Sequence, residues 1–334
     1  MLLERKFPSN THGRSTSTTQ TRIAILLPCY NEESGIYKVA TDFRRALPNA
    51  TVYVYDNNSS DNTVQLAQEA GAIVRFEPRQ GKGHVVRRMF ADIEADIFVM
   101  CDADDTYDAS CAAHLVEVLE EQGLDMVVGA RKPESGGTYR RGHEIGNWIL
   151  SALVRKIFGD RFRDMLSGYR VFSRRFVKSF PVMSGGFEIE TELTIHALEL
   201  EMPACEIPVA FRSRAPGSAS KLRTVRDGFR ILGTIVILLK QERPLQFFST
   251  FALLLSIVSV ILAAPVVGTY IETGLVPRFP TAILSSTLML LAFLFFFSGQ
   301  ILQTVTRGRQ EAKRMRYLAI PGVHARSGLR TDES

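Results

Sequence analysis

Residues 96–104 read DIFVMCDAD, an apolar run that ends on two carboxylates. Short runs rich in Val and Ile are typical of strands buried on both faces of a sheet. Similar runs recur between residues 22 and 131, separated by amphipathic stretches. This alternation predicts an α/β domain built on a doubly wound, mostly parallel sheet. The expected strands are 23–28, 51–56, 72–77, 96–104 and 124–131, with helices near 33–46, 61–71, 82–95 and 109–122.

Two long segments near the carboxyl terminus, 247–270 and 281–305, contain no charged residue. About 20 apolar residues in a helix cross a bilayer core, so we expect a two-span transmembrane hairpin over 247–305. Its flanks are rich in Lys and Arg and its inner loop is not, which predicts that the α/β domain and both termini face the cytoplasm. The alternative is a pair of helices buried in a soluble core.

Composition divides the rest of the chain. Residues 1–21 are polar and rich in Ser and Thr, which predicts a disordered tail. We expect the α/β domain over 22–222, an amphipathic interfacial helix over 223–246 and a basic tail over 306–334. The four Cys have no paired spacing, which disfavours a disulfide framework or a cysteine-rich zinc site. A formal charge of +5 is small for a nucleic-acid binder, so no nucleic-acid partner is expected.

Polar side chains follow the expected strands, where ligands bind in open α/β sheets. Asp102 and Asp104 are two residues apart, so on an extended chain they point the same way and suit one hard cation, Mg²⁺ or Mn²⁺. Asp56 stands at the tip of the second strand, where a carboxylate can accept N–H bonds from a base. Tyr30 could stack on a base, and Lys82 lies between two glycines, although no P-loop is present. The alternatives are a solvated loop, a turn with a helix start, and helix capping by Ser60 or Asp61.

Taken together, the segments PCYNEE (28–33), YDNNSSDNT (55–63), GKG (81–83) and DADD (102–105) resemble in order and spacing the nucleotide-sugar site of the family 2 glycosyltransferases, which have the GT-A fold. The resemblance implies that the α/β domain is a GT-A catalytic domain. It also implies that the diphosphate is held through Mg²⁺ or Mn²⁺, with Asp104 the more direct ligand. The donor residues implied are Pro28, Tyr30, Glu32, Asp56, Lys82, Asp102 and Ala103, and the metal ligands implied are Asp102 and Asp104.

Segments 164–170 (DMLSGYR), 186–193 (GFEIETEL) and 211–222 (FRSRAPGSASKL) resemble the polyprenyl-phosphate branch of that family. The resemblance implies a lipid-phosphate acceptor met by fixed cations, or else a basic surface facing anionic lipid. Asp164 would orient the acceptor or Arg170, act as a base, or pair with Arg163 or Arg170. Glu190 and Glu192 would line the acceptor side or simply begin a helix. The implied catalytic residues are Asp104, Asp164, Arg131 and Arg170, and the implied acceptor residues are Arg212, Arg214, Ser218 and Lys221.

The resemblance implies transfer of a hexose, with inversion, from a UDP- or GDP-sugar to undecaprenyl or dolichyl phosphate. It places this step at the cytoplasmic face of an inner or plasma membrane, for cell-envelope glycan synthesis, in an enzyme that bacterial relatives suggest is a homo-oligomer. The motif Q-x-x-R-W is absent, which disfavours a processive synthase. Two alternatives stay open: a glycosyltransferase acting on a glycan or glycolipid hydroxyl, and a non-catalytic membrane subunit that binds nucleotide sugar.

Overall fold

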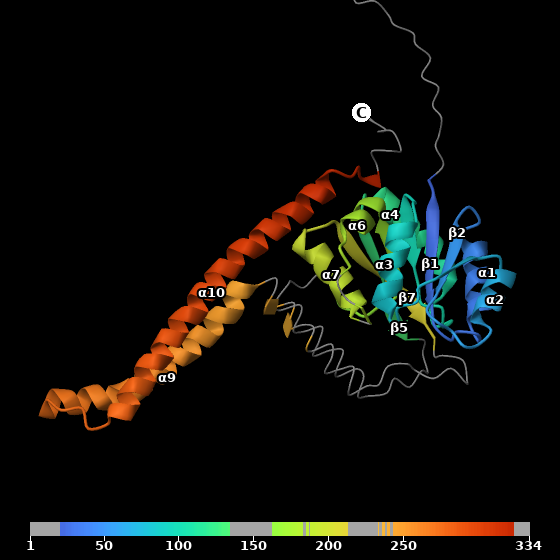
Figure 1. Ribbon diagram of the computed structural model, residues 1–334. Coiled ribbons are helices and arrows are strands. Elements are labelled where there is room, and N and C mark those ends of the chain that lie inside the picture. The colour runs from blue at the N-terminus through green and yellow to red at the C-terminus, as the bar shows by residue number, and fades with distance from the viewer. Residues whose placement is uncertain are drawn as a thin grey trace, which may run out of the picture.

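A seven-stranded sheet forms the centre of an α/β domain in the computed structural model (Figure 1). The structure describes residues 21–133, 162–182, 185–186, 188–212, 233, 236–237, 239–240 and 243–323. The strands are β1 (Ile23–Cys29), β2 (Thr51–Asp56), β3 (Ile73–Phe76), β4 (Ile97–Met100), β5 (Met126–Pro133), β6 (Arg170–Ser173) and β7 (Ala204–Phe211). Their order in the sheet is β3-β2-β1-β4-β6-β5-β7.

Strand pairing confirms the mostly parallel sheet that the sequence predicts. β1 pairs in parallel with β2 and β4, β2 with β3, and β5 with β7. β6 is antiparallel to both β4 and β5. Arg170 begins β6 opposite Met100, which ends β4, so the chain before β6 returns to the carboxyl edge of the sheet. That return brings residues 164–169 to the edge where ligands bind in such folds.

Two apolar layers cover the sheet. On one face α3, α6 and α7 bury side chains such as Phe90 and Phe176, and on the other α1 and α4 bury Phe43 and Leu115. Helices α1, α3 and α4 bury apolar residues that recur three and four positions apart and so share one side, whereas α7 is buried on all sides. Their bounds are α1 (Ile36–Ala46), α2 (Thr63–Glu69), α3 (Lys82–Asp92), a 3-10 turn η1 (Ala109–Cys111), α4 (Ala112–Glu121), α6 (Arg174–Ser179) and α7 (Ile189–Glu199).

Two of the expected strands differ from the structure in an informative way. β3 was expected to be buried on both faces, but Ile73 and Phe76 are exposed because β3 is an edge strand with a neighbour on one side only. β4 ends at Met100, whereas the sequence predicts a strand through residue 104. The two carboxylates at 102 and 104 therefore lie in the loop after the strand.

Two long helices, α9 (Pro244–Thr273) and α10 (Phe279–Leu318), form the expected hairpin and extend away from the sheet (Figure 1). Both are long and apolar enough to cross a membrane, and only 17% of the most apolar stretch of each is buried. Phenylalanine rings pack across the two helices, and the buried residues of each recur seven positions apart, a spacing that returns to the same side of a helix every two turns. These residues are Ala252, Ser259 and Val266 on α9 and Ser285, Ala292, Gly299 and Thr306 on α10.

Helix α10 continues beyond residue 305, the expected end of the second span, through Leu318. Its charged last part contacts the α/β domain. Lys313 pairs with Glu199 at 2.7 Å, and the hydroxyl of Tyr317 donates to Asp125 at 2.6 Å. The segment expected to be a basic tail thus continues α10 over 306–318, and the end of that helix packs on the domain. The expected tail 1–21 and interfacial helix 223–246 lie mostly outside the described residues.

Candidate active site

The loops that follow β1, β2 and β4 lie side by side at the carboxyl edge of the sheet. Cys29 is in register with Asp56, and the amide of Asn57 donates to the carbonyl of Cys29 at 2.9 Å. On the other side of β1, the amide of Cys101 donates to the carbonyl of Leu26 at 3.1 Å. The structure therefore brings the motifs at 28–33, 56–63 and 102–105 together, as the sequence predicts for neighbouring parallel strands.

Each of these three loops contains one residue with a left-handed backbone. Asn31 follows β1 with φ of 51°, Asn58 follows β2 with φ of 65°, and Asp105 follows β4 with φ of 58°. Asn and Asp tolerate this region better than other residues with a Cβ. Sparsely populated backbone conformations concentrate at functional sites, where the surrounding structure holds them in place. Three such residues in neighbouring loops at one edge of the sheet support a binding site there.

Asp56 is buried and has one carboxylate oxygen available for a ligand. Its Oδ2 accepts the amide of Ser59 at 3.1 Å. Its Oδ1 is buried and has no hydrogen-bond partner among the described residues. A buried acceptor without a partner carries a free-energy cost that a ligand N–H would remove. Nearby, Tyr30 is exposed, Pro28 is half-buried, and the buried Glu32 is tied to α2 through its amide and Thr63 Oγ1 at 2.8 Å.

Asn57, which the sequence did not single out, holds the loop that leads to α3. Its side-chain amide donates to the carbonyls of Glu77 at 2.8 Å and Arg79 at 2.7 Å, and its Oδ1 accepts the amide of Gly81 at 2.7 Å. Residue type and position alone gave no signal for this role, because the three partners belong to another loop. The consequence is a fixed start for α3, with Lys82 as its first residue.

The ammonium of Lys82 lies between two carboxylates from different parts of the chain. It pairs with Asp102 and, at 2.5 Å, with Glu190 on the first turn of α7. Burial lowers the pKa of Lys82, but the two carboxylates outweigh it and the pKa is raised above its ordinary value. Burial raises the pKa of Glu190, and Lys82 opposes that shift only in part. Lys82 therefore stays a cation and compensates charge next to Asp102.

The carboxylates of Asp102 and Asp104 are the two candidate metal ligands. The side chain of Asp102 is 31% exposed, whereas Asp104 is buried and accepts the hydroxyl of Thr106 at 2.6 Å. Ala103 between them is buried. Among the described residues no cluster of three His, Cys, Asp or Glu side chains could hold an ion alone. Two carboxylates suit a hard cation such as Mg²⁺, which keeps waters and takes further oxygens from a phosphate.

Gly168 lies against the carboxylate of Asp102, a contact that the sequence did not reveal. A Cβ built on Gly168 would lie 2.3 Å from Oδ2 of Asp102, so no residue with a side chain fits there without displacing the carboxylate. The amide of Gly168 donates to Tyr107 Oη at 3.0 Å, and the hydroxyl of Ser167 donates to the carbonyl of Gly129 at 2.5 Å. The 164–170 loop is therefore pinned directly against a candidate metal ligand.

Asp164 pairs with Arg131 through both carboxylate oxygens, and not with Arg163 or Arg170. Arg131 Nε donates to Oδ2 at 2.8 Å and a terminal guanidinium nitrogen donates to Oδ1 at 2.7 Å, while the amide of Arg131 also donates to Oδ2 at 3.0 Å. Burial raises the pKa of Asp164, but Arg131 outweighs burial and the pKa is lowered overall. An ionised, fully engaged carboxylate orients Arg131 and is a poor general base.

Arg170 was expected at the site on the carboxyl edge of the sheet, but its side chain lies in the interior. It is fully buried, and its guanidinium donates to the carbonyls of Met165 at 2.6 Å and Ser167 at 2.9 Å and to the hydroxyl of Thr194 at 2.9 Å. Burial lowers its pKa to about 10. Its side chain points into the interior because β6 begins there between β4 and β5. Through these hydrogen bonds Arg170 holds the 164–170 loop from the interior side and does not line the surface.

The remaining expected residues lie beside the site or outside the described chain. Arg212 is half-exposed, its amide donates to the carbonyl of Thr106 at 2.8 Å, and its guanidinium lies 3.7 Å from Asp108. This places Arg212 next to the loop that carries Asp104. Glu192 is buried in the first turn of α7. Arg214, Ser218 and Lys221 lie outside the described residues.

Comparison with known proteins defines the class of the molecule. The model of Glycosyl transferase family 2 matches residues 24–180, the span that carries the three edge loops and the Gly168 contact. Glycosyltransferase AglJ of Haloferax volcanii is 36% identical over 234 residues, 70% of this chain and 77% of that protein. The chain therefore belongs to glycosyltransferase family 2 and is a glycosyltransferase.

Two further comparisons concern a relative and the fold. The dolichyl-phosphate hexose transferase of Haloferax volcanii is 26% identical over 228 residues, 68% of this chain and 98% of that protein. Glucosyl-3-phosphoglycerate synthase from Mycobacterium tuberculosis, in complex with Mn²⁺, uridine diphosphate and glucosyl-3-phosphoglycerate, superposes with a TM-score of 0.54 at 24% identity, covering 65% of this chain and 79% of that one. The superposition confirms the GT-A-like fold of the α/β domain.

Proposed function

We propose that the protein transfers a hexose from a nucleotide sugar to a polyprenyl phosphate at a membrane surface, with inversion at the sugar C1. The observation that carries this proposal is that Asp56 lies at the same edge of the sheet as the carboxylates of Asp102 and Asp104. Oδ1 of Asp56 is buried and has no hydrogen-bond partner among the described residues. A base-recognising acceptor and a phosphate-metal site on neighbouring loops fit the two ends of a nucleotide sugar. The relative named dolichyl-phosphate hexose transferase supports a lipid-phosphate acceptor.

Asp102 and Asp104 would hold a divalent cation, Mg²⁺ or Mn²⁺. Their oxygen donors and the partial exposure of Asp102 fit such an ion. The superposed synthase complex that contains Mn²⁺ and uridine diphosphate supports the same assignment. Bound there, the ion would neutralise charge on the departing nucleoside diphosphate. Lys82, fixed beside Asp102, supplies a permanent positive charge at the same end of the donor.

Arg131 would meet the acceptor phosphate. Its guanidinium is held at two points by Asp164, which leaves it pre-oriented at the carboxyl edge. A phosphate monoester oxygen is already a nucleophile, so the transfer needs no general base. The oxygen–C1 bond to the lipid phosphate forms while the C1–oxygen bond to the nucleoside diphosphate breaks. The engagement of Asp164 disfavours the alternative acceptor, a hydroxyl group, which would need a carboxylate base.

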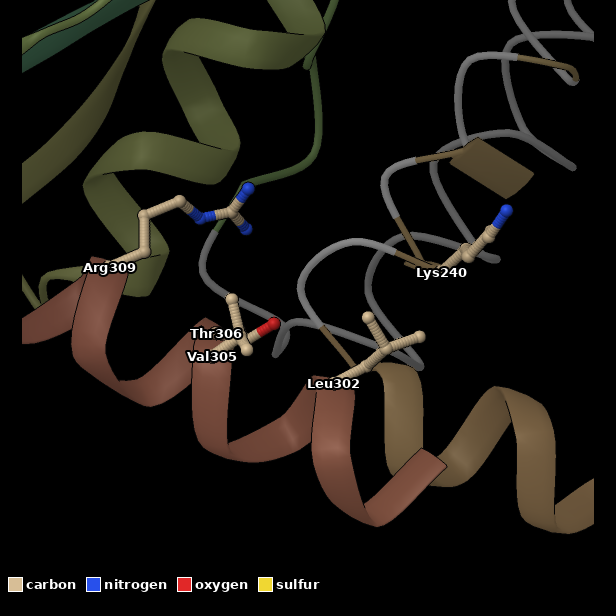
Figure 2. Close-up of a pocket in the computed structure, with 5 residues that line it drawn as sticks. All are labelled: Lys240, Leu302, Val305, Thr306 and Arg309. Atoms are coloured by element: carbon tan, nitrogen blue, oxygen red, sulfur yellow. The ribbon is translucent and has the colours of Figure 1, made fainter. Parts of the chain in front are cut away.

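The hairpin would keep the site at the bilayer. The apolar part of α10 ends where Leu302 and Val305 give way to Arg309, and these residues line a pocket together with Lys240 and Thr306 (Figure 2). Cations directly beyond an apolar span are typical of the cytoplasmic headgroup region. We infer that the α/β domain and both termini are cytoplasmic and that the site opens toward the lipid surface.

The test is transfer by the purified full chain in bilayers to undecaprenyl phosphate or to dolichyl phosphate, with a panel of UDP- and GDP-hexoses and mass analysis of the lipid. We expect a single-hexose lipid phosphate that requires Mg²⁺ or Mn²⁺. Asp56→Asn should raise the donor KM by about 10- to 100-fold, because it presents an amide to the base. Glu69→Gln, which neutralises an exposed carboxylate at the end of α2 that accepts the side chain of Gln65, is the matched control. Transfer to glycolipid hydroxyls alone would refute the proposal.

A further inference from the structure

We infer that Asp125, Arg175 and Tyr317, here named the docking cluster, are positioning residues that fix the height and tilt of the catalytic edge above the bilayer through α10. The inference rests on the proposed function, since it concerns an acceptor embedded in lipid. The docking cluster lies outside the candidate active site, and no sequence motif pointed to it.

Without α10, the buried carboxylate of Asp125 would lack one of its four side-chain hydrogen bonds. Asp125 is fully buried before β5. Its Oδ1 accepts Ser173 Oγ at 2.6 Å and Arg175 Nε at 2.5 Å, and its Oδ2 accepts a terminal nitrogen of Arg175 at 2.8 Å and the hydroxyl of Tyr317 at 2.6 Å. A buried carboxylate is stable only when its oxygens are well bonded. Tyr317, which comes from α10, supplies one of those bonds.

Further contacts hold the end of α10 in one orientation. The guanidinium of Arg175 stacks over the ring of Tyr317, with 4.7 Å from its central carbon to the ring centroid. One helical turn earlier, Lys313 pairs with Glu199, the last residue of α7, at 2.7 Å. Val323, just beyond α10, packs against the apolar layer that covers the other face of the sheet. The docked segment therefore spans contacts on both sides of the sheet.

The docking cluster lies at the edge of the sheet opposite to the candidate active site. Ser173 is in register with Ile97, the first residue of β4, and Asp125 precedes β5, which runs in the same direction as β4. Figure 1 shows α10 rising along the side of the domain that carries α6 and α7, to the end at which β1 begins. The catalytic edge is the other end of the strands. Because α10 is attached at the edge opposite to the active site, the catalytic edge lies on the side of the domain toward which the hairpin extends.

The connection between bilayer and domain is stiff. Helix α10 is continuous from Phe279 to Leu318. Its charged part, residues 306–318, adds about 20 Å at about 1.5 Å a residue, a length comparable to that of a strand. A continuous helix fastened at its far end transmits both height and rotation. The distance from the catalytic edge to the lipid phosphates is then set by the length of this helix.

The experiment changes that length in the full chain in nanodiscs. Seven helix-forming residues inserted after Arg309 add about two turns and about 10 Å while keeping the docked face in phase. Height is read by energy transfer from a dye placed at Tyr37, which is 49% exposed in the first turn of α1, to an acceptor dye at the bilayer surface. Seven residues inserted into the loop between α9 and α10 are the matched control, because that loop lies at the other end of the hairpin.

We expect the α10 insertion to lower energy transfer. Transfer of sugar to long-chain polyprenyl phosphate in the bilayer should fall at least about ten-fold, since misplacement by even about 1 Å can cost this much. Transfer to a water-soluble short-chain polyprenyl phosphate should stay within about two-fold, and the control insertion should change neither. If the α10 insertion does not fold, Lys313→Ala combined with Tyr317→Ala, compared with Arg316→Ala combined with Met315→Ala, gives the same contrast between the two acceptors.

Unchanged energy transfer and unchanged bilayer activity in the α10 insertion would overturn the inference. Equal losses with both acceptors would also overturn it, because they would mark a merely structural role. If the unmodified protein glycosylates no polyprenyl phosphate, the proposed function fails. The energy-transfer measurement still decides the positioning role in that case, since it needs no turnover.

Discussion

Arg131 and Asp164 form a two-point ion pair, with 2.8 Å and 2.7 Å between their nitrogen and oxygen atoms, although 33 positions separate them in the chain. Asp164→Asn keeps the shape of that pair but removes its charge. We expect kcat to fall about 10- to 100-fold with little change in donor KM, because Arg131 loses its orientation. The change is measured by steady-state kinetics with each substrate varied in turn.

The same variant separates an orienting carboxylate from a base. Arg131 keeps the pKa of Asp164 below its ordinary value despite burial, so Asp164 is ionised throughout the neutral range. We therefore expect the acidic limb of the pH–rate profile to be the same in the unmodified protein and in Asp164→Asn. Loss of that limb in the variant would identify Asp164 as a base. Arg131→Lys, which keeps the charge but not the fork, should lose activity to a similar degree.

Gly168→Ala tests the contact between the 164–170 loop and the metal ligand. The new methyl group would lie 2.3 Å from Oδ2 of Asp102, so the carboxylate or the loop has to move. We expect the affinity for Mn²⁺ in the presence of donor nucleotide to fall about 10- to 100-fold, the range for outer residues that orient a ligand. Isothermal calorimetry measures it. The control is Gly308→Ala on α10, which has no atom within 4 Å of its Cβ; unchanged affinity in both would refute the contact.

Lys82→Met leaves Asp102 and Glu190 without their shared cation. Breaking a buried ion pair from one side destabilises by about 3–5 kcal/mol, and the pKa of Glu190, already raised by burial, should rise further. The raised folded pKa of a carboxyl group means that stability is greatest below its unfolded value and falls as pH increases. Denaturant unfolding of Lys82→Met should therefore show a steeper loss of stability from pH 5 to pH 7 than the unmodified protein, and an equal slope would contradict this reading.

His196 should make the domain sensitive to acid. Burial lowers its pKa to about 3, and its ring packs against Phe176 and Phe180. Above its ordinary pKa of about 6.5 neither the folded nor the unfolded state is protonated. As pH falls from there toward 3, only the unfolded chain binds the proton, so stability decreases by about 1.4 kcal/mol per pH unit. His196→Leu should reduce that slope in denaturant unfolding, whereas the exposed His114→Leu should not.

The sequence predicted the strands because β1, β2 and β4 are apolar runs of a length and composition that admit little else. It also predicted which motifs meet, since parallel strands put their carboxyl ends at one edge. It did not show that Arg170 is fully buried, because a charged residue near a motif gives no information on whether its side chain faces solvent or interior. The pairing of Arg131 with Asp164 likewise needed the antiparallel placement of β6 between β4 and β5.

Residue order alone was thus enough to predict the family, the sheet, the carboxylates at strand ends and the two apolar helices. Which charged groups pair and which are buried followed from the folded chain, as in the contacts of Lys82 with Asp102 and Glu190 and of Tyr317 with Asp125. Apolar periodicity repeats every few residues and is therefore legible along the chain. The partner of a buried charge is chosen by three-dimensional packing, and here it lies up to 192 residues away.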